Sequence, residues 1–307
     1  MEYRTIGQTS IEVSEIAMGL WGVSGGDVWG DQAEQDAIDA IHAAIDEGVT
    51  FFDTAEGYGD GYSEELLGKA LETRNRDDLV IATKVSAGNL RPEDLQSACE
   101  RSLERLNTDY VDVYYIHRWD DDTPIRETLR TLTELVREGK VHHLAASSMA
   151  AWKLTKALWT SDVEGLERFE VTQPRFNAAD YPEDYLDVCA DQGLAVCPYS
   201  PLDGGFLTGK YERDRAPQGS RAELNDWDME FSDRQWRVLD AVRTVADEVD
   251  ATPAQVSLRW LIEQPRFTCV PIFGARSVEQ LEENVAAAEI SLSDEQFDRI
   301  ADAYHDD

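Results

Sequence analysis

The feature that most constrains the fold is an alternation of short β-type runs with amphipathic helical runs along almost the whole chain. Regular alternation of this kind indicates an α/β protein with a parallel sheet. Eight strands, each followed by a helix, are the number that closes a (β/α)8 barrel. The expected strands are Ile16–Leu20, Thr50–Thr54, Leu79–Lys84, Val111–His117, Val141–Ser147, Phe169–Gln173, Leu194–Tyr199 and Val270–Gly274.

The helical signal is clearest at 92–107, where Leu95, Cys99 and Leu106 recur at intervals that place them on one helix face. Pro92 suits the first turn of this helix, where its missing N–H costs nothing. An open, doubly wound sheet is the alternative fold, but no G-x-G-x-x-G motif follows the first strand. The expected helices are 33–48, 63–73, 92–107, 124–139, 149–160, 181–192, 233–249 and 277–288, with two more at 253–263 and 293–304.

Two further segments lie outside this alternation. The first residues predict a small β-hairpin, with strands Tyr3–Ile6 and Ile11–Val13, that plugs the bottom of the barrel. The connection from Pro201 to Ser232 is rich in Gly, Arg, Asp and Pro, and a loop of that length is typical of a functional lid or a disordered insertion. We therefore expect a single domain over 1–307: a TIM barrel with an N-terminal hairpin, a long loop after strand seven and extra C-terminal helices.

Charge limits the partners of this chain, because 62 acidic residues against 28 basic ones give a net charge of −34. Such a surface repels phosphate backbones and anionic lipid heads, so we expect neither a nucleic-acid nor a membrane partner. The acidic residues are spread along the chain and only six residues are lysine, a pattern typical of proteins from salt-accumulating halophiles. An acidic mesophilic enzyme is the alternative.

No basic-then-apolar leader follows Met1, and the apolar runs are far shorter than a membrane span, so we expect a cytoplasmic protein. Cys99, Cys189, Cys197 and Cys269 lack C-x-x-C spacing and lie in apolar stretches. This predicts buried free thiols rather than a metal site or a disulfide framework.

Four polar residues lie at or just beyond the ends of expected strands: Asp53 after strand two with Tyr58 close behind, Lys84 at strand three and His117 at strand four. Each alone has an ordinary explanation, as a helix cap, an exposed loop aromatic, a surface lysine or a core histidine. In a barrel, however, the carboxyl ends of the strands meet at one mouth, where active sites are built. We therefore expect these four side chains to lie together.

This combination suits the reduction of a carbonyl group. A tyrosine hydroxyl has a pKa of about 10, and a nearby ammonium lowers that pKa while a carboxylate holds the lysine in place. Tyr58 is then the general acid, Lys84 its tuning partner, Asp53 the partner of the lysine, and a neutral His117 the group that orients the substrate oxygen. The reaction needs a hydride source, so we expect a nicotinamide pocket.

The chain resembles the aldo-keto reductase superfamily, in particular the prokaryotic branch similar to potassium-channel β subunits. The resemblance covers nearly the whole chain in the family's order. It rests on the segments F-F-D-T-A-E-G-Y-G (51–59), A-T-K (82–84), Y-Y-I-H-R-W-D (114–120), A-A-S-S (145–148), T-Q-P (172–174), Y-S-P-L-D-G-G-F-L-T-G-K-Y (199–211) and G-A-R-S-V-E-Q-L-E-E-N (274–284).

The resemblance implies a (β/α)8 barrel that binds NAD(P)H in an extended form and reversibly reduces aldehydes, ketones or sugar carbonyls. It places Asp53, Tyr58, Lys84 and His117 in the family's catalytic tetrad. The channel subunits lack the histidine, so its presence favours an enzyme. The resemblance assigns Ser147 and Gln173 to the nicotinamide carboxamide and Tyr199 to the face of the nicotinamide ring. It assigns to the pyrophosphate the backbone around Ser200, Pro201, Leu202 and Gly204, with Lys210 and Arg221, and to the adenosine end Gly274, Arg276, Gln280, Glu283 and Asn284. The other cofactor residues that it implies are Trp21, Asp27, Asp53 and Ser148.

NADPH is preferred over NADH in this interpretation, because Arg276 offers a partner for a 2′-phosphate. NADH stays open, since the acidic Glu279 lies beside that arginine. Ser148 departs from the asparagine that the family often has, and Asp27 and Asp203 bring negative charge near a dianionic ligand.

An aromatic substrate pocket is expected from Trp21, Trp29, Tyr58, His117 and Trp119. The carbonyl substrate itself, and the oligomeric state, are not fixed by the sequence. Arg118 and Arg175 lie near strand ends and offer charge to an anionic substrate. The helix-borne tryptophans, by contrast, are expected to pack on the outside of the barrel: Trp152, Trp159, Trp236 and Trp260.

Two other functions stay open. One is an NADP(H)-binding redox sensor or regulatory subunit with little turnover, as the likeness to channel subunits allows. The other is a metal-dependent lyase or isomerase that uses Asp53 and His117, although no second histidine or carboxylate clusters with them at the strand ends. We therefore expect a reductase without a metal.

Overall fold

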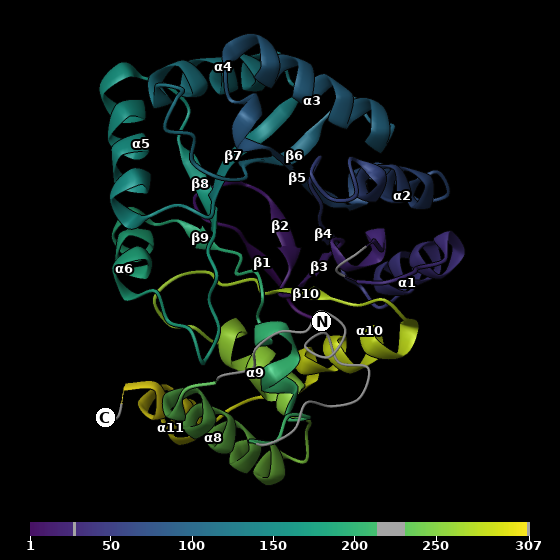
Figure 1. The fold of residues 1–307 in the computed structure, drawn as a ribbon, viewed down its shortest axis with the longest axis vertical. Coiled ribbons are helices and arrows are strands. Elements are labelled where there is room, and N and C mark those ends of the chain that lie inside the picture. The colour runs from purple at the N-terminus through teal and green to yellow at the C-terminus, as the bar shows by residue number, and fades with distance from the viewer. Residues whose placement is uncertain (27–28, 214–230, 306–307) are drawn as a thin grey trace.

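Eight parallel strands form one sheet in the order β10-β3-β4-β5-β6-β7-β8-β9 (Figure 1). The structure is a computed structural model that describes residues 1–26, 29–213 and 231–305. Hydrogen bonds of 2.9 Å from Val196 N to Thr268 O and from Val270 N to Val196 O join β9 to the chain that enters β10, so the sheet closes. The strands are β3 (Ala17–Gly19), β4 (Phe51–Asp53), β5 (Val80–Val85), β6 (Val111–Ile116), β7 (Val141–Ser147), β8 (Phe169–Gln173), β9 (Ala195–Val196) and β10 (Ile272–Gly274).

Helices cover the outside of these strands, and α8, α9 and α11 gather at one end of the molecule (Figure 1). The predicted (β/α)8 barrel and its extra C-terminal helices are confirmed. The helices are α1 (Glu34–Asp46), α2 (Tyr62–Leu71), α3 (Pro92–Leu106), α4 (Ile125–Arg137), α5 (Ala151–Glu164), α6 (Glu183–Gln192), α8 (Asp233–Val249), α9 (Pro253–Ile262), α10 (Val278–Val285) and α11 (Asp294–His305).

Helix ends follow local chemistry. Ser232 and Thr252 cap α8 and α9. Each side chain accepts from the backbone N–H of the glutamine three residues on, and the backbone N–H of each capping residue donates to the side-chain oxygen of that glutamine. Helix α5 runs one turn beyond the expected 149–160, since it ends only where Gly165 adopts a left-handed conformation with φ 66°. The helix expected at 277–288 ends earlier, and its last turn is a 3-10 turn, Ala286–Glu289.

An N-terminal hairpin of β1 (Tyr3–Thr5) and β2 (Glu12–Ser14) lies within the ring of strands (Figure 1). Its buried residues Ile6 and Val13 belong to the same apolar cluster as the inward-facing residues of the strands. The hairpin leads directly into β3, so it fills the amino-terminal end of the barrel. The predicted plug is confirmed, and it leaves the carboxyl ends of the strands as the open rim.

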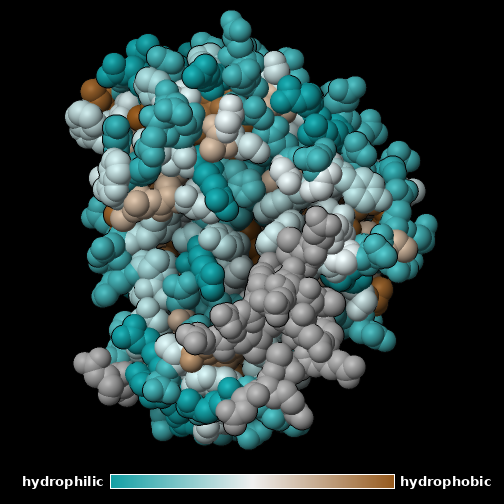
Figure 2. Space-filling model, viewed as in Figure 1, coloured by the Kyte–Doolittle hydropathy of each residue, from teal (hydrophilic) through white to brown (hydrophobic). Residues whose placement is uncertain are grey.

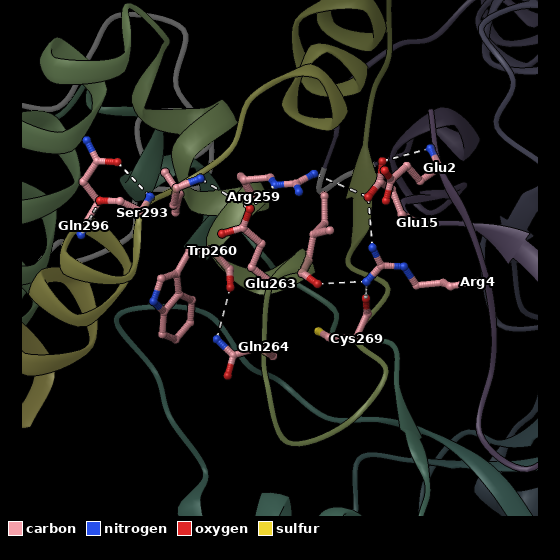
Figure 3. A network of polar contacts seen from close by, with 12 residues as sticks. Glu2, Arg4, Glu15, Arg259, Trp260, Glu263, Gln264, Cys269, Ser293 and Gln296 are labelled. Atoms are coloured by element: carbon pink, nitrogen blue, oxygen red, sulfur yellow. Dashed lines mark hydrogen bonds and ion pairs between the residues drawn. The ribbon is translucent and has the colours of Figure 1, made fainter.

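A buried carboxylate ties this hairpin to the C-terminal helices (Figure 3). The side chain of Glu15 is fully buried and lies 2.9 Å from Arg4 and 3.4 Å from Arg259 of α9. Arg4 also donates to the carbonyls of Ile262 and Cys269 at 2.8 and 3.4 Å. The first and last parts of the barrel are therefore joined by charged groups that satisfy one another.

The visible surface is mostly hydrophilic, as the charge of the chain leads one to expect (Figure 2). All four cysteines are buried free thiols, as predicted. Among the helices that the structure describes, none combines the length and the apolar character that crossing a membrane requires.

Candidate active site

Lys84 lies at the centre of the site, because β4 and β5 are adjacent parallel strands with Asp53 at the end of one and Lys84 near the end of the other. The lysine side chain is fully buried. Its ammonium donates to Asp53 Oδ1 at 2.6 Å, to the Thr54 carbonyl at 2.7 Å and to Tyr58 Oη at 3.2 Å. An ammonium has three N–H groups, so all three of them have acceptors here.

Gln173 reaches Asp53 from across the barrel. Its Nε2 donates to Asp53 Oδ2 at 2.8 Å, although the two residues are 120 positions apart in the chain. Ser147 lies opposite Gln173 in the register of β7 and β8, and its hydroxyl donates to the Gln173 carbonyl at 3.0 Å. Two residues that the resemblance assigned to the nicotinamide amide therefore adjoin the proposed catalytic group.

Tyr58 and His117 complete the set at the rim. Tyr58 follows β4 in a short turn in which its N–H donates to the Ala55 carbonyl at 3.0 Å. His117 follows β6, and its N–H donates to the Val85 carbonyl at 2.9 Å. Their rings lie edge to face with centroids 5.7 Å apart. The structure thus brings together all four side chains that the strand ends predicted.

Burial sets the charge state of the rim residues. Burial raises the pKa of the Tyr58 phenol, and the Lys84 ammonium opposes this effect only in part. The Lys84 ammonium does lower that pKa, as expected, but the cost of placing a phenolate in a buried site is larger, so the net shift of the Tyr58 pKa is upward. Burial, with Lys84 and Arg118, lowers the pKa of His117 to about 3.

Lys84 itself stays charged. Burial lowers the pKa of its ammonium, but the Asp53 carboxylate and the Tyr58 oxygen outweigh that effect, so the pKa of Lys84 is raised overall. At neutral pH the site therefore holds a protonated phenol, a neutral imidazole and an ammonium. This arrangement can donate a proton to a carbonyl oxygen that also accepts a hydrogen bond from the histidine.

An aromatic wall adjoins Tyr58. Trp21 stacks on the Tyr58 ring with centroids 6.1 Å apart, and Trp29 meets Trp21 edge to face at 5.3 Å. Trp119 has its ring contacts elsewhere, with Trp152 of α5 at 6.3 Å and with the ammonium groups of that helix. Of the expected pocket residues, Trp21, Trp29, Tyr58 and His117 form one contiguous group.

The four helix-borne tryptophans divide into two kinds, so the expectation of outer packing is only half right. Trp236 and Trp260 are buried, whereas Trp152 and Trp159 are 61% and 65% exposed. The exposed pair lies on the outer face of α5, which packs its opposite face, including Leu154 and Leu158, on the barrel.

The turn after β9 holds the residues expected near a pyrophosphate, including Ser200, Pro201, Leu202 and Gly204. Asp203 in this turn is buried and forms an ion pair with Arg175 at 2.5 Å. The negative charge of Asp203 is therefore compensated by Arg175. The sequence did not predict this ion pair, because Arg175 follows β8 whereas Asp203 follows β9. Arg175 also forms an ion pair with Asp180 at 2.7 Å. Because two carboxylates already hold this guanidinium, the suggestion that Arg175 serves an anionic substrate is not supported.

Tyr199 continues the pairing beyond β9 through a bridge to Arg175. Lys210 is exposed and interacts electrostatically with Glu283 of α10, so this residue of the long connection lies near α10. Residues 214–230 of the connection lie outside the described residues. Ser148 has a positive φ of 48° and lies beside Ser147, with their hydroxyls 3.3 Å apart. Asp27 and Arg221 lie outside the described residues.

The start of α10 gathers the residues expected at the adenosine end. The Arg276 N–H donates to Gln280 Oε1 at 2.9 Å, and Asn284 Nδ2 donates to the Gly274 carbonyl at 3.4 Å. A Cβ added at Gly274 would meet no atom within 4 Å, so open space adjoins the backbone there. The Arg276 guanidinium also contacts residues 29–32, which the sequence did not predict.

A metal centre would need several clustered ligands. Across residues 1–26, 29–213 and 231–305, no group of three or more His, Cys, Asp and Glu side chains is arranged to hold a metal ion.

Comparison with known proteins places this geometry in a family. The model of the aldo/keto reductase family matches residues 15–305. The NADH-specific methylglyoxal reductase of Escherichia coli (strain K12) is 32% identical, with 94% of this chain and 94% of that protein covered. A probable voltage-gated potassium channel subunit beta of Arabidopsis thaliana is also 32% identical, covering 94% of this chain and 92% of that protein.

Among solved structures, the crystal structure of a thermostable aldo-keto reductase in complex with the inhibitor epalrestat superposes with a TM-score of 0.80. It is 31% identical, and the match covers 99% of this chain and 100% of that chain. A match this long, at this identity and with this geometry at the barrel mouth, leads to one conclusion. The chain belongs to the aldo/keto reductase family.

Proposed function

We propose that this chain is an NAD(P)H-dependent reductase of aldehydes, ketones or sugar carbonyls, with Tyr58 as proton donor, and that the whole chain 1–307 acts as one domain. The observation that carries the proposal is the buried Lys84 ammonium, which bridges Asp53 at 2.6 Å and Tyr58 at 3.2 Å at the open rim of the barrel. Carbonyl reduction requires a proton donor, here the Tyr58 phenol, beside a cation that stabilises the phenolate left behind, here the Lys84 ammonium.

The donor set fits a nicotinamide dinucleotide. Ser147 and Gln173 offer a hydroxyl and an amide beside Asp53, and the open space at Gly274 adjoins Gln280 and Asn284 of α10. We propose the cofactor residues named in the sequence analysis for this role wherever they lie on described segments. When bound, the nicotinamide supplies the hydride for the carbonyl carbon.

In the proposed mechanism, the side chains of this chain handle the oxygen and the proton. His117 stays neutral because its pKa is lowered to about 3, and it donates a hydrogen bond that orients the carbonyl oxygen. Tyr58 Oη transfers its proton to that oxygen as negative charge develops there, which yields the alcohol. Lys84 stabilises the phenolate that is left until a proton from water restores the phenol.

The proposed preference for NADPH depends on Arg276. Three of its five N–H groups donate to residues 29–32, and among the described residues the other two are left for a 2′-phosphate. The methylglyoxal reductase of Escherichia coli is NADH-specific, so the two cofactors must be compared directly. Equal affinities for NADPH and NADH, before and after Arg276→Ala, would rule out this assignment.

The first experiment is NADPH oxidation by the purified protein in molar KCl against aromatic aldehydes, aliphatic aldehydes and aldoses, with Tyr58→Phe in parallel. The proposal expects turnover by the wild type and a loss of about 10²-fold or more in the variant. NADPH binding without turnover by either protein would instead favour a redox sensor or regulatory subunit. We further propose that the protein works in a salt-rich cytoplasm, to which its charge of −34 is suited.

A further inference from the structure

The first loop joins β3 to α1 and is described over residues 20–26 and 29–33. Arg276 connects this loop to the start of α10. Its Nε donates to Gln32 Oε1 at 3.0 Å and its Nη2 to the Asp31 carbonyl at 2.7 Å, while Nη1 donates to the Trp29 carbonyl. Gln32 Nε2 returns a bond of 3.2 Å to the Arg276 carbonyl. A planar guanidinium that holds three acceptors fixes their relative positions, which a single ammonium does not do.

The stem of the same arginine lies on the turn that carries Trp21. A Cβ added at Gly22 would lie 3.4 Å from Arg276 Cγ, so the methylene groups pack closely on the backbone there. This turn, Gly22–Ser24, begins immediately after Trp21. Arg276 therefore contacts both ends of the first loop, the turn beside Trp21 and the segment 29–32.

Aromatic contacts continue from this loop to the proton donor. Trp29, whose carbonyl accepts from Arg276, meets Trp21 edge to face at 5.3 Å. Trp21 in turn stacks on Tyr58 at 6.1 Å. A contiguous set of packed groups thus leads from the adenosine end of the expected cofactor site to the wall of the carbonyl pocket.

We propose that Arg276 is a positioning residue that sets the aromatic wall of the substrate pocket through the first loop. The residue expected to read the 2′-phosphate then also controls how the aldehyde binds. This inference rests on the proposed reductase function. It predicts that the affinity for an aromatic carbonyl depends on Arg276 even when the cofactor carries no 2′-phosphate.

The test distinguishes the positive charge of Arg276 from the several N–H donors of its planar guanidinium. Three variants are compared with the wild type: Arg276→Ala, Arg276→Lys, which keeps the charge, and Gln32→Ala, which removes one loop acceptor. Each is assayed with 4-nitrobenzaldehyde and saturating NADH, then NADPH. We expect the KM for the aldehyde to rise about fivefold with NADH in all three, with a smaller change in kcat. Arg276→Lys is expected to retain the preference for NADPH.

A second readout does not depend on turnover. The near-ultraviolet circular dichroism of the cofactor-free protein reports the packing of its aromatic side chains, Trp21, Trp29 and Tyr58 among them, and we expect it to weaken in Arg276→Ala and Gln32→Ala. The control is Arg299→Ala on α11, which removes a partly exposed arginine paired with Glu248 and Glu295 and is expected to leave the spectrum unchanged. If the chain is not a reductase, the wild type will show no turnover, and the comparison of spectra will still test the role of Arg276.

The inference is overturned if Arg276→Ala changes only the affinity for NADPH. It is also overturned if the KM for the aldehyde with NADH stays within twofold of the wild-type value in the three variants. A spectrum of Arg276→Ala and Gln32→Ala that matches the Arg299→Ala control would overturn it too.

Discussion

The rings of Tyr58 and His117 lie edge to face at the barrel rim, with their centroids 5.7 Å apart. Neither group is expected to change charge near neutrality, because burial raises the pKa of Tyr58 and lowers the pKa of His117 to about 3. We predict that kcat for carbonyl reduction stays flat between about pH 5 and pH 9. Alcohol oxidation, which needs the phenolate as base, is expected to rise about tenfold per pH unit over that range.

Steady-state pH profiles in both directions check this prediction. An inflection in the reduction profile near pH 6.5, the ordinary pKa of histidine, would show instead that a protonated His117 takes part. His117→Gln, which keeps a hydrogen-bond donor, should leave the shape of both profiles unchanged while lowering kcat.

Replacing Lys84 by methionine should affect activity and stability by different routes. We expect kcat to fall by about 10²–10⁴-fold, since Tyr58 loses the cation that stabilises its phenolate. Stability should fall by about 3 kcal/mol, because Asp53 is left buried without its ion-pair partner. The double variant Asp53→Asn/Lys84→Met should recover most of that stability and none of the activity. Guanidinium unfolding and kcat measure the two effects, and a double variant as unstable as Lys84→Met would contradict the argument.

The buried Glu15 predicts a second stability effect, far from the site. Arg4→Met removes the partner 2.9 Å from a side chain that has no exposed surface, so we expect a loss of about 2 kcal/mol in the free energy of unfolding. Arg299→Met breaks the exposed pair with Glu248 and should cost less than about 1 kcal/mol. Chemical unfolding of both variants makes the comparison, and equal losses would argue against a special role for the buried carboxylate.

Salt should stabilise the fold. At about 0.1 M salt the screening length is about 10 Å, and at about 1 M it is about 3 Å, so added KCl weakens repulsion within a chain of net charge −34. We predict that Tm rises by about 5 °C or more over that range, and that NaCl gives the same rise at equal ionic strength. Thermal scans measure this effect, and a Tm that does not respond to salt would remove the case for a halophilic protein.

The proposed catalytic residues could be grouped from the sequence because a parallel barrel places all strand ends on one rim. Asp53 and Lys84 needed only the correct strand boundaries to be predicted as neighbours, and the register of β4 and β5 provides that contact. The turn that carries Tyr58 follows β4 at once, so its position was constrained too.

Pairings between side chains on distant segments were not predictable in this way. The Arg175–Asp203 ion pair and the Arg276 contacts with residues 29–32 depend on rotamers and loop paths, which no periodicity in the sequence encodes. The outward tryptophans of α5 were misjudged for a related reason. A tryptophan in a helical pattern is read as apolar, yet the face that it occupies is set by the helix's rotation on the barrel.

A primary amine beside an aldehyde pocket carries a chemical hazard, because a free amine condenses with aldehydes to an imine. The three acceptors around Lys84 remove that hazard: with every N–H donated and the pKa of the ammonium raised, the nitrogen has no lone pair to attack a carbonyl carbon. The barrel can therefore hold a lysine within reach of reactive carbonyl compounds and keep it from becoming a covalent adduct. The same contacts that place the proton donor also protect the protein from its own substrates.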